Sequence, residues 1–452
     1  MKLASPWEPR LTPGDDPPFE RLAATLADDI AAGLIGAGDR LPAHRDLAWR
    51  IGLGVGTVTK AYAKLEQRGL VRSLHGRGMF VAGTSAMATG SIDLGINAPP
   101  QMLSDRLLQA TLSTLAKRLD AETFGAYSHP AGRPEHRRLM ARWLARWGVD
   151  AGPDRIMLTH GAQHALAIAV AMACPPGTHL LTEALTYPGG LLVARQAGLE
   201  TIGLAMDREG LTPGALAEAL GADHGRHRVL YVTPTLHNPT TATMGAERRQ
   251  DVVRLCRAHD VIIIEDDVYG IFAPAGVRPL ACLAPERTFH VTSLSKALSP
   301  GLRMGALVVP SDRVAEAEAR LQASSTMASA LQAEIMGMWL TDGTAEAVAS
   351  SIRADAVRRS AFAADRLPKQ AALRINDGFH AWLPMPAEAA DRFVARAALR
   401  GVALMPARAA MADPSAPDGG VRISLGAPAM AQLDQALGIL ADLFLPERPV
   451  LV

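Results

Sequence analysis

The chain has 452 residues, of which 48% are hydrophobic but only 4% aromatic, so Ala, Leu and Val must fill most of a large core. With 46 Lys and Arg against 45 Asp and Glu, the net charge of +1 excludes a uniformly basic protein, and any basic patch must be local. Cys174, Cys256 and Cys282 form no CxxC pair, which argues against a disulfide framework, and we predict no metal site.

Two features bear on location. Residues 1–10 lack the apolar stretch of a signal peptide. The most apolar helical stretch, residues 165–174, is too short to span a bilayer. We therefore expect a soluble, cytoplasmic protein without membrane contact.

The first 82 residues predict three helices followed by a hairpin. Apolar residues recur on one face of a helix over 19–33. Further helices are expected from after Pro42 to about residue 51 and over about 56–67. Short strands at 70–74 and 79–81 flank a Gly-containing turn. This order is typical of a winged helix-turn-helix.

Small polar residues at 83–91 predict a short linker, and residues 92–452 form the second domain. Its apolar runs alternate with helical segments, which predicts an α/β domain with a mostly parallel sheet covered by helices on both faces. The runs are Ile156–Leu158, Val229–Val232, Val261–Ile264 and Leu307–Val309. A smaller C-terminal α+β subdomain is expected from about residue 325, with strand-like segments from about residue 370.

Between Arg40 and Arg77 there are eight Lys or Arg residues and two acidic ones, a net charge of +6 within 38 residues. Such a local excess suits DNA, because phosphate neutralisation supplies most of the affinity. A run of charged residues by itself is as often an ordinary solvent-exposed surface as a DNA-binding one. In a helix-turn-helix the second helix enters the major groove, and here it begins near Gly56.

The segment from Gly38 to Gly83 resembles the GntR family of winged-helix regulators along its whole length. The matching parts include Leu41-Pro42, Thr57-Val58, Gly69-Leu70 and the wing Gly76-Arg77-Gly78. The resemblance implies contacts with operator DNA by Arg45, Thr57, Thr59, Lys60, Arg77 and Gly78. Many members have Ser-Arg or Thr-Arg where this chain has Gly54-Val55, so base readout there is expected to be weaker or shifted.

Lys296 is flanked by Ser293, Ser295 and Arg303. Schiff-base chemistry needs an amine held at a buried aldehyde, with hydroxyls and a guanidinium nearby to bind a phosphate. Asp266 follows an apolar strand, where α/β ligand sites form, and could pair with a protonated pyridine nitrogen. Tyr269 and Asn238 could both reach the phenolate oxygen of such a ring.

The strand Ile156–Leu158 leads through Gly161-Ala162-Gln163 into a helix, a strand, turn and helix N-terminus that can cradle a phosphate. Tyr187 could stack on a flat ring. Each piece alone has an ordinary explanation, since Tyr-Pro-Gly is usually a turn and Asp-Asp after a strand is usually a cap.

In this order the pieces resemble fold type I pyridoxal-phosphate enzymes, the aminotransferase group, over about residues 92–448. The resemblance implies that Lys296 forms the Schiff base, that Asp266 pairs with the ring nitrogen and that Arg422 takes an α-carboxylate. It also implies that the other cofactor-binding residues are Ala162, Gln163, Tyr187, Asn238, Tyr269, Ser293, Ser295, Arg303 and, from the neighbouring subunit of a homodimer, Tyr127. Ala162 stands where many relatives have a hydroxyl residue, so one phosphate hydrogen bond is expected to be lost.

A GntR-type winged helix fused to an aminotransferase-like domain resembles the MocR regulators. The resemblance implies a DNA-binding transcriptional regulator that senses pyridoxal 5'-phosphate, or an amino acid or amine, through the second domain. Two alternatives stay open: a working aminotransferase with an accessory helix-turn-helix, and a DNA-binding protein whose large domain only dimerises. The intact Lys296, Asp266 and Arg303 argue against the last, but a sensor and an enzyme need the same site residues.

Overall fold

The computed structural model describes residues 7, 9–13, 16–31, 35, 39–67, 71–74, 78–81, 91–119, 121–222 and 226–444. The chain divides into two compact units, residues 1–90 and 91–452, which we describe separately. Among the described residues, no helix is both long and apolar enough to cross a membrane.

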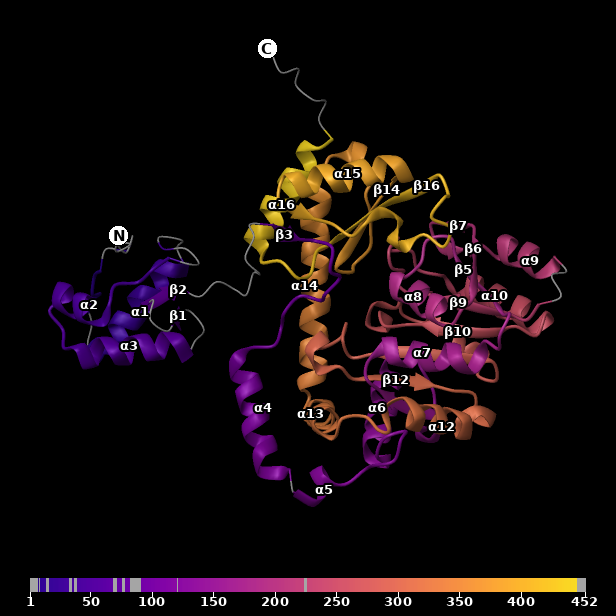
Figure 1. The fold of residues 1–452 in the computed structure, drawn as a ribbon, viewed down its shortest axis with the longest axis horizontal. Coiled ribbons are helices and arrows are strands. Elements are labelled where there is room, and N and C mark those ends of the chain that lie inside the picture. Colours follow the sequence, from indigo (N-terminus) through magenta and orange to yellow (C-terminus); the bar gives the residue numbers. More distant parts are fainter. Residues whose placement is uncertain are drawn as a thin grey trace, which may run out of the picture. The chain divides into compact units, whose positions relative to one another are not determined.

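The first unit packs three helices and a hairpin around one apolar core (Figure 1). Its helices are α1 (Pro18–Ala31), α2 (His44–Ile51) and α3 (Val55–Gln67), and its strands are β1 (Val71–Leu74) and β2 (Gly78–Val81). Gly52 ends α2 with a φ of 67°, a left-handed conformation that glycine adopts without strain and that turns the chain toward α3. The antiparallel pairing of β1 and β2 forms the wing, and the predicted winged helix-turn-helix is confirmed.

A seven-stranded sheet forms the centre of the second unit, in the order β4-β12-β11-β10-β9-β5-β6. All its strands are parallel except β12, which runs antiparallel to both of its neighbours. The strands are β4 (Ile156–Thr159), β5 (His179–Glu183), β6 (Glu200–Leu204), β9 (Arg228–Val232), β10 (Ile262–Asp266), β11 (Thr288–Ser293) and β12 (Gly305–Val308).

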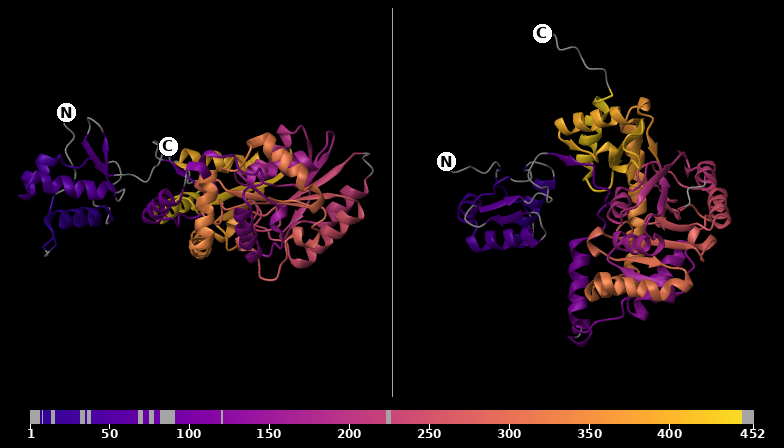
Figure 2. Two further views of the ribbon diagram at one scale, coloured as in Figure 1. Left: turned by 90° about the horizontal axis from the view of Figure 1, so that it is seen from below. Right: turned by 45° about the vertical axis from the view of Figure 1, so that its right-hand side comes forward.

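Both faces of the central part of this sheet are buried, because alternate residues of β4, β12, β10, β9 and β5 enter different apolar clusters. Met157 and Leu307 pack with helix α7 on one face, whereas Ile156 and Val308 pack with α6, α13 and α14 on the other (Figures 1 and 2). The helices of this unit up to residue 366 are α4 (Asp105–Arg118), α5 (Ala121–Gly125), α6 (Pro134–Arg146), α7 (Ala162–Ala173), α8 (Pro188–Gln196), α9 (Pro213–Gly221), α10 (Ala246–Ala258), α11 (Leu280–Leu283), α12 (Val314–Ser325), α13 (Ala330–Thr341) and α14 (Thr344–Arg366). The predicted mostly parallel α/β fold is confirmed.

The C-terminal part forms a smaller α+β layer with its own core. Its antiparallel sheet has the order β13-β14-β16, and two helices, α15 and α16, pack with it (Figure 1). A separate parallel pair joins β15 to β3, which comes from the very start of this unit. The elements are β3 (Ile92–Asp93), β13 (Arg374–Ile375), β14 (His380–Pro386), α15 (Ala387–Leu399), β15 (Val402–Ala403), β16 (Asp418–Ser424) and α16 (Met430–Asp442), and a further hairpin in the unit pairs β7 (Met206–Asp207) with β8 (Gly210–Leu211).

Candidate functional site

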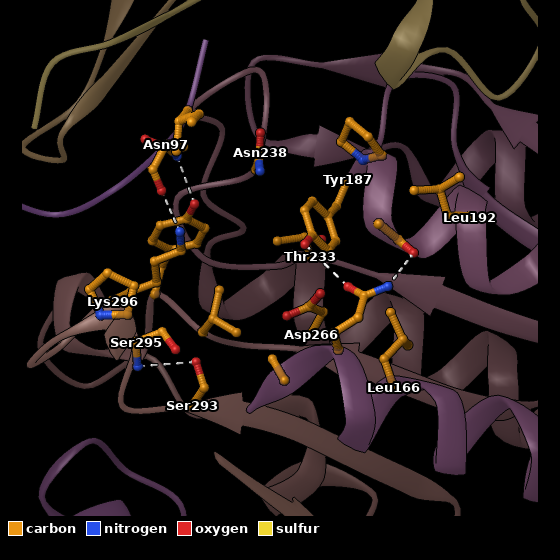
Figure 3. A pocket seen from close by; sticks show the side chains of 18 of the residues that line it. Asn97, Leu166, Tyr187, Leu192, Thr233, Asn238, Asp266, Ser293, Ser295 and Lys296 are labelled. Carbon is orange, nitrogen blue, oxygen red and sulfur yellow. Dashed lines mark hydrogen bonds between the residues drawn. The ribbon is translucent and has the colours of Figure 1, made fainter. Parts of the chain in front are cut away.

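A pocket of about 650 Å³ lies where the carboxyl ends of the central strands meet β16 of the smaller layer. Eleven of the residues predicted from the sequence line it together: Ala162, Gln163, Tyr187, Asn238, Asp266, Tyr269, Ser293, Ser295, Lys296, Arg303 and Arg422. Figure 3 shows Lys296 and the two serines on one side of the pocket and Tyr187 on the other. They come from segments that span most of the second unit, so only the fold brings them together.

One end of the pocket is built as an anion cradle. Gly161 joins β4 to α7 with a φ of 83°, and a Cβ there would lie 2.8 Å from the Arg303 Nη2 atom, so this turn requires glycine. The amides of the first turn of α7 have no acceptor within the helix and suit an anion. The Arg303 guanidinium donates to the His160 carbonyl oxygen (3.3 Å), and the buried Ser295 hydroxyl has no hydrogen-bond partner among the described residues.

Asp266 ends β10 and is buried beneath the pocket. The Tyr231 hydroxyl donates a hydrogen bond of 2.8 Å to its Oδ2 atom, while Oδ1 has no partner in the part of the chain that the structure describes. Burial raises the pKa of this carboxyl to about 6, and the hydrogen bond from Tyr231 opposes that rise. Oδ1 is therefore a buried acceptor that a protonated ring nitrogen would satisfy.

Lys296 supplies an amine whose pKa lies far below its ordinary value. Burial is the main cause, the nearby Arg422 guanidinium adds to it, and together they lower the pKa of Lys296 to about 8. The Lys296 Nζ atom donates to the main-chain oxygen of Asn97, and the Asn97 side chain donates to the Tyr269 hydroxyl at 2.8 Å. Burial also raises the pKa of Tyr269, which therefore stays protonated and can donate. An amine with a pKa this low has a far larger neutral fraction than an ordinary lysine, and the neutral form is the nucleophile.

Arg422 reaches the pocket from β16 in the smaller layer. Its Nη1 atom donates to the Asn238 Oδ1 atom at 2.7 Å, and its Nη2 atom donates to the Gly95 carbonyl oxygen. Because the Asn238 Oδ1 atom already accepts from Arg422, the Nδ2 atom remains as its donor group. The guanidinium is a buried cation, and this favours an anionic ligand group beside it.

Tyr187 directly precedes α8 and forms a wall of the pocket (Figure 3). Its hydroxyl donates to the Gln163 Oε1 atom at 3.2 Å, and the Gln163 side chain donates to the Gly189 carbonyl oxygen at 2.9 Å. These bonds fix the aromatic ring and the start of α7 relative to each other.

Tyr127 is not among the residues that line the pocket, and its side chain is 86% exposed. Its predicted role toward a neighbouring subunit stays a prediction.

Sequence reasoning missed Asn97 and Tyr231, which contact Lys296, Tyr269 and Asp266. Tyr231 had a detectable signal, because it is a hydroxyl-bearing residue within the apolar run Val229–Val232.

The predicted DNA-contacting residues that the structure describes lie on α2, α3 and β2. Arg45 on α2 and Thr59 and Lys60 on α3 are exposed, whereas Thr57 is half-buried. The Thr59 hydroxyl donates to the Val55 carbonyl oxygen at 2.9 Å, so its lone pairs remain for a donor from DNA. Gly78 is the first residue of β2, and Arg77 lies outside the described residues.

Comparison with known proteins accounts for both units. The family model for aminotransferase class I and II matches residues 89–440. The chain belongs to this family. The model for bacterial regulatory proteins of the gntR family matches residues 18–81, so the predicted MocR-type architecture is confirmed.

Relatives of this aminotransferase-family chain carry regulator names. It is 28% identical to the uncharacterized HTH-type transcriptional regulator YdeF of Bacillus subtilis over 97% of this chain and 96% of YdeF. It is 29% identical to the vitamin B6 salvage pathway transcriptional repressor PtsJ of Salmonella typhimurium, over 80% and 84% of the two chains. An archaeal alanine:glyoxylate aminotransferase shares the fold, with a TM-score of 0.72, 22% identity and coverage of 86% of this chain and 94% of that one.

Proposed function

We propose that this protein is a DNA-binding transcriptional regulator that holds pyridoxal 5'-phosphate in the pocket and responds there to the cofactor itself, or to an amino acid or amine. One observation carries the proposal: a single chain joins a gntR-family domain to a pocket with a low-pKa lysine, a buried aspartate and two arginines. An enzyme needs such a pocket but has no need of a winged helix.

The residues present fit this cofactor. The unpartnered Asp266 Oδ1 atom matches a protonated ring nitrogen, and the unpartnered Ser295 hydroxyl and the Gly161 turn match a phosphate. The amides of Ala162 and Gln163, Ser293 and Arg303 would complete the phosphate site. When bound, the cofactor supplies an aldehyde for amines and a ring that withdraws electrons.

The remaining roles are proposed from the positions of the lining residues. Lys296 would provide the amine that reacts with the aldehyde, Tyr269 and the Asn238 amide would donate to the ring hydroxyl, and Tyr187 would pack against the ring face. Arg422 would bind the carboxylate of an amino-acid ligand. A homodimer would bring Tyr127 of one subunit to the phosphate of the other. The regulatory names of relatives, including a repressor of vitamin B6 salvage, support the same role.

The test measures attachment and DNA binding together. Borohydride reduction of the cofactor-loaded wild type should leave a pyridoxyl group on Lys296, and Lys296→Ala should abolish it. Lys117→Ala, which removes a lysine from α4, is the matched control and should keep the label. A label on another lysine, or DNA affinity that never responds to the cofactor or to any of a panel of amino acids and amines, would contradict the proposal.

A second function is favoured by one observation: Lys296 and Arg422, which a transaminating enzyme requires, are both present with perturbed pKa values. The protein would then be an aminotransferase with an accessory DNA-binding unit. Sustained turnover of an amino acid and a keto acid, together with DNA affinity that ignores ligands, would favour the enzyme. Ligand-dependent DNA affinity favours the regulator even if slow turnover accompanies it.

A further inference from the structure

Residues 91–97 open the second unit, and residues 82–90 join them in sequence to the DNA-binding unit. The first half of this segment is tied to the smaller layer. The Ile92 amide donates to the Gly401 carbonyl oxygen at 2.7 Å, and the Leu94 amide donates to the Ala403 carbonyl oxygen at 2.8 Å. The Ser424 amide donates to the Leu94 carbonyl oxygen at 3.0 Å. The segment therefore moves with the layer that carries Arg422.

The second half of the segment is held by three pocket side chains. Arg422 donates to the Gly95 carbonyl oxygen, and Lys296 donates to the Asn97 carbonyl oxygen. The Asn97 side chain donates to the Tyr269 hydroxyl at 2.8 Å. These three side chains are the ones to which the proposed function assigns the ligand's carboxylate, aldehyde and ring hydroxyl.

Asn97 is the centre of these contacts. It is 7% exposed, and its Nδ2 atom also lies 3.3 Å from the His380 Nδ1 atom. The His380 Nε2 atom lies 3.1 Å from the His237 carbonyl oxygen, which can only accept, so His380 donates there and its Nδ1 atom accepts from Asn97. The amide of Asn97 is thus oriented by two acceptors, one in each layer.

A ligand must compete for the atoms that hold this segment. Attachment of an aldehyde to the Lys296 Nζ atom uses the nitrogen that donates to Asn97. A carboxylate at Arg422 would carry a full negative charge, whereas the Gly95 carbonyl oxygen is neutral, so the carboxylate would compete with that oxygen for the guanidinium. Occupation of the pocket therefore weakens the contacts of the segment that leads to the DNA-binding unit.

We propose that Asn97 is a positioning residue of the pocket and that residues 91–97 carry the state of the ligand to the DNA-binding unit. This inference rests on the proposed function and names the element that couples its two sites. In the ligand-free protein the three pocket side chains hold the segment, and in the ligand-bound protein Lys296 and Arg422 release it.

The test uses the full chain, with and without saturating pyridoxal phosphate, and a DNA duplex selected from a random pool by the wild type. In the wild type, the cofactor should speed hydrogen–deuterium exchange in peptides covering residues 91–98 and change DNA affinity by roughly 5–150-fold. Asn97→Ala lacks the bond to Tyr269. Without cofactor it should already show the faster exchange, and its DNA affinity should match that of the cofactor-bound wild type.

Asn376→Ala is the matched control, because it removes another amide that donates to a carbonyl oxygen, that of Thr241, away from the segment. It should behave as the wild type. If the wild type responds and Asn97→Ala responds to the same extent from the same starting affinity, this inference fails while the proposed function stands. The inference also fails if Asn376→Ala shows the same constitutive state. If the DNA affinity of the wild type ignores the cofactor and all amino acids, the proposed function itself fails.

Discussion

The Tyr231 hydroxyl donates to Asp266 from the neighbouring strand, so one carboxylate oxygen is fixed and the other is left for the pocket. Burial raises the pKa of this carboxyl to about 6. The hydrogen bond from Tyr231 stabilises the charged form and so limits that rise. Asp266 thus remains charged at neutral pH within a site that disfavours charge.

We predict that Tyr231→Phe weakens cofactor binding in a pH-dependent way. A hydrogen bond to a charged group contributes about 1.5–3 kcal/mol, so its loss should raise the pKa of Asp266 by roughly 1–2 units. Cofactor affinity, measured by fluorescence titration, should decline as pH falls and Asp266 becomes protonated. In the variant this decline should begin at a correspondingly higher pH than in the wild type. Tyr62→Phe, which removes the hydroxyl of another buried tyrosine, should leave the pH profile unchanged.

We predict that Asp266→Asn stabilises the protein when no cofactor is added. The folded pKa of about 6 exceeds the ordinary 3.8, so the folded state binds a proton more tightly and loses stability as pH rises through this window. Removing the carboxyl should raise the free energy of unfolding by up to about 3 kcal/mol at pH 7 and by nothing near pH 3. Denaturant titrations at the two pH values check this, and an equal gain at both would contradict it.

The attachment rate of the cofactor should follow the neutral fraction of Lys296. With a pKa near 8, the rate should climb between pH 7 and 9 and then level off, whereas an ordinary lysine would still gain above pH 10. Arg422→Gln removes a cation that disfavours the ammonium form, so the midpoint should move upward. Stopped-flow absorbance gives the rates, and a midpoint that stays fixed in the variant would refute the electrostatic link.

On the DNA side, Arg45→Ala and Arg77→Ala should each weaken binding. Each lost phosphate contact should reduce the slope of log affinity against log salt by roughly 1. Fluorescence anisotropy over a series of salt concentrations measures both quantities. Arg254→Ala removes an exposed arginine of the second unit and serves as the control. Unchanged slopes in both variants would rule out the assigned surface.

Tyr127 leads to a prediction about subunit exchange. If it serves the partner's pocket, Tyr127→Ala homodimers should bind the cofactor weakly, and Lys296→Ala homodimers should form no covalent attachment. Mixed dimers of the two variants should regain one intact pocket, which holds Lys296 of one subunit and Tyr127 of the other. Borohydride labelling of the mixture detects it. Sedimentation should give twice the chain mass, and a monomer that binds cofactor tightly would remove Tyr127 from the site.

The residues best predicted from sequence are those in short motifs at strand ends. Asp266 ends the apolar strand β10 and Lys296 lies three residues after β11, and parallel strands bring their carboxyl ends to one edge of a sheet. Asn97 was not predicted as a site residue, because its partners Tyr269 and Lys296 lie 172 and 199 residues away and no local sequence pattern connects them. Tyr231 was included only as part of the apolar run Val229–Val232, and no role was predicted for its hydroxyl. The reversed direction of β12 was also not predictable, because the pattern of apolar residues is the same whichever way a strand runs in the sheet.

The pairing of β3 with β15 joins positions 92–93 to positions 402–403. During synthesis the winged helix is complete once about 80 residues have emerged, but the strand that follows it has no partner until more than 300 further residues are made. Arg422 arrives later still. A nascent or prematurely terminated chain would therefore present the winged helix before the pocket is complete, so the proposed ligand response would depend on translation passing residue 422.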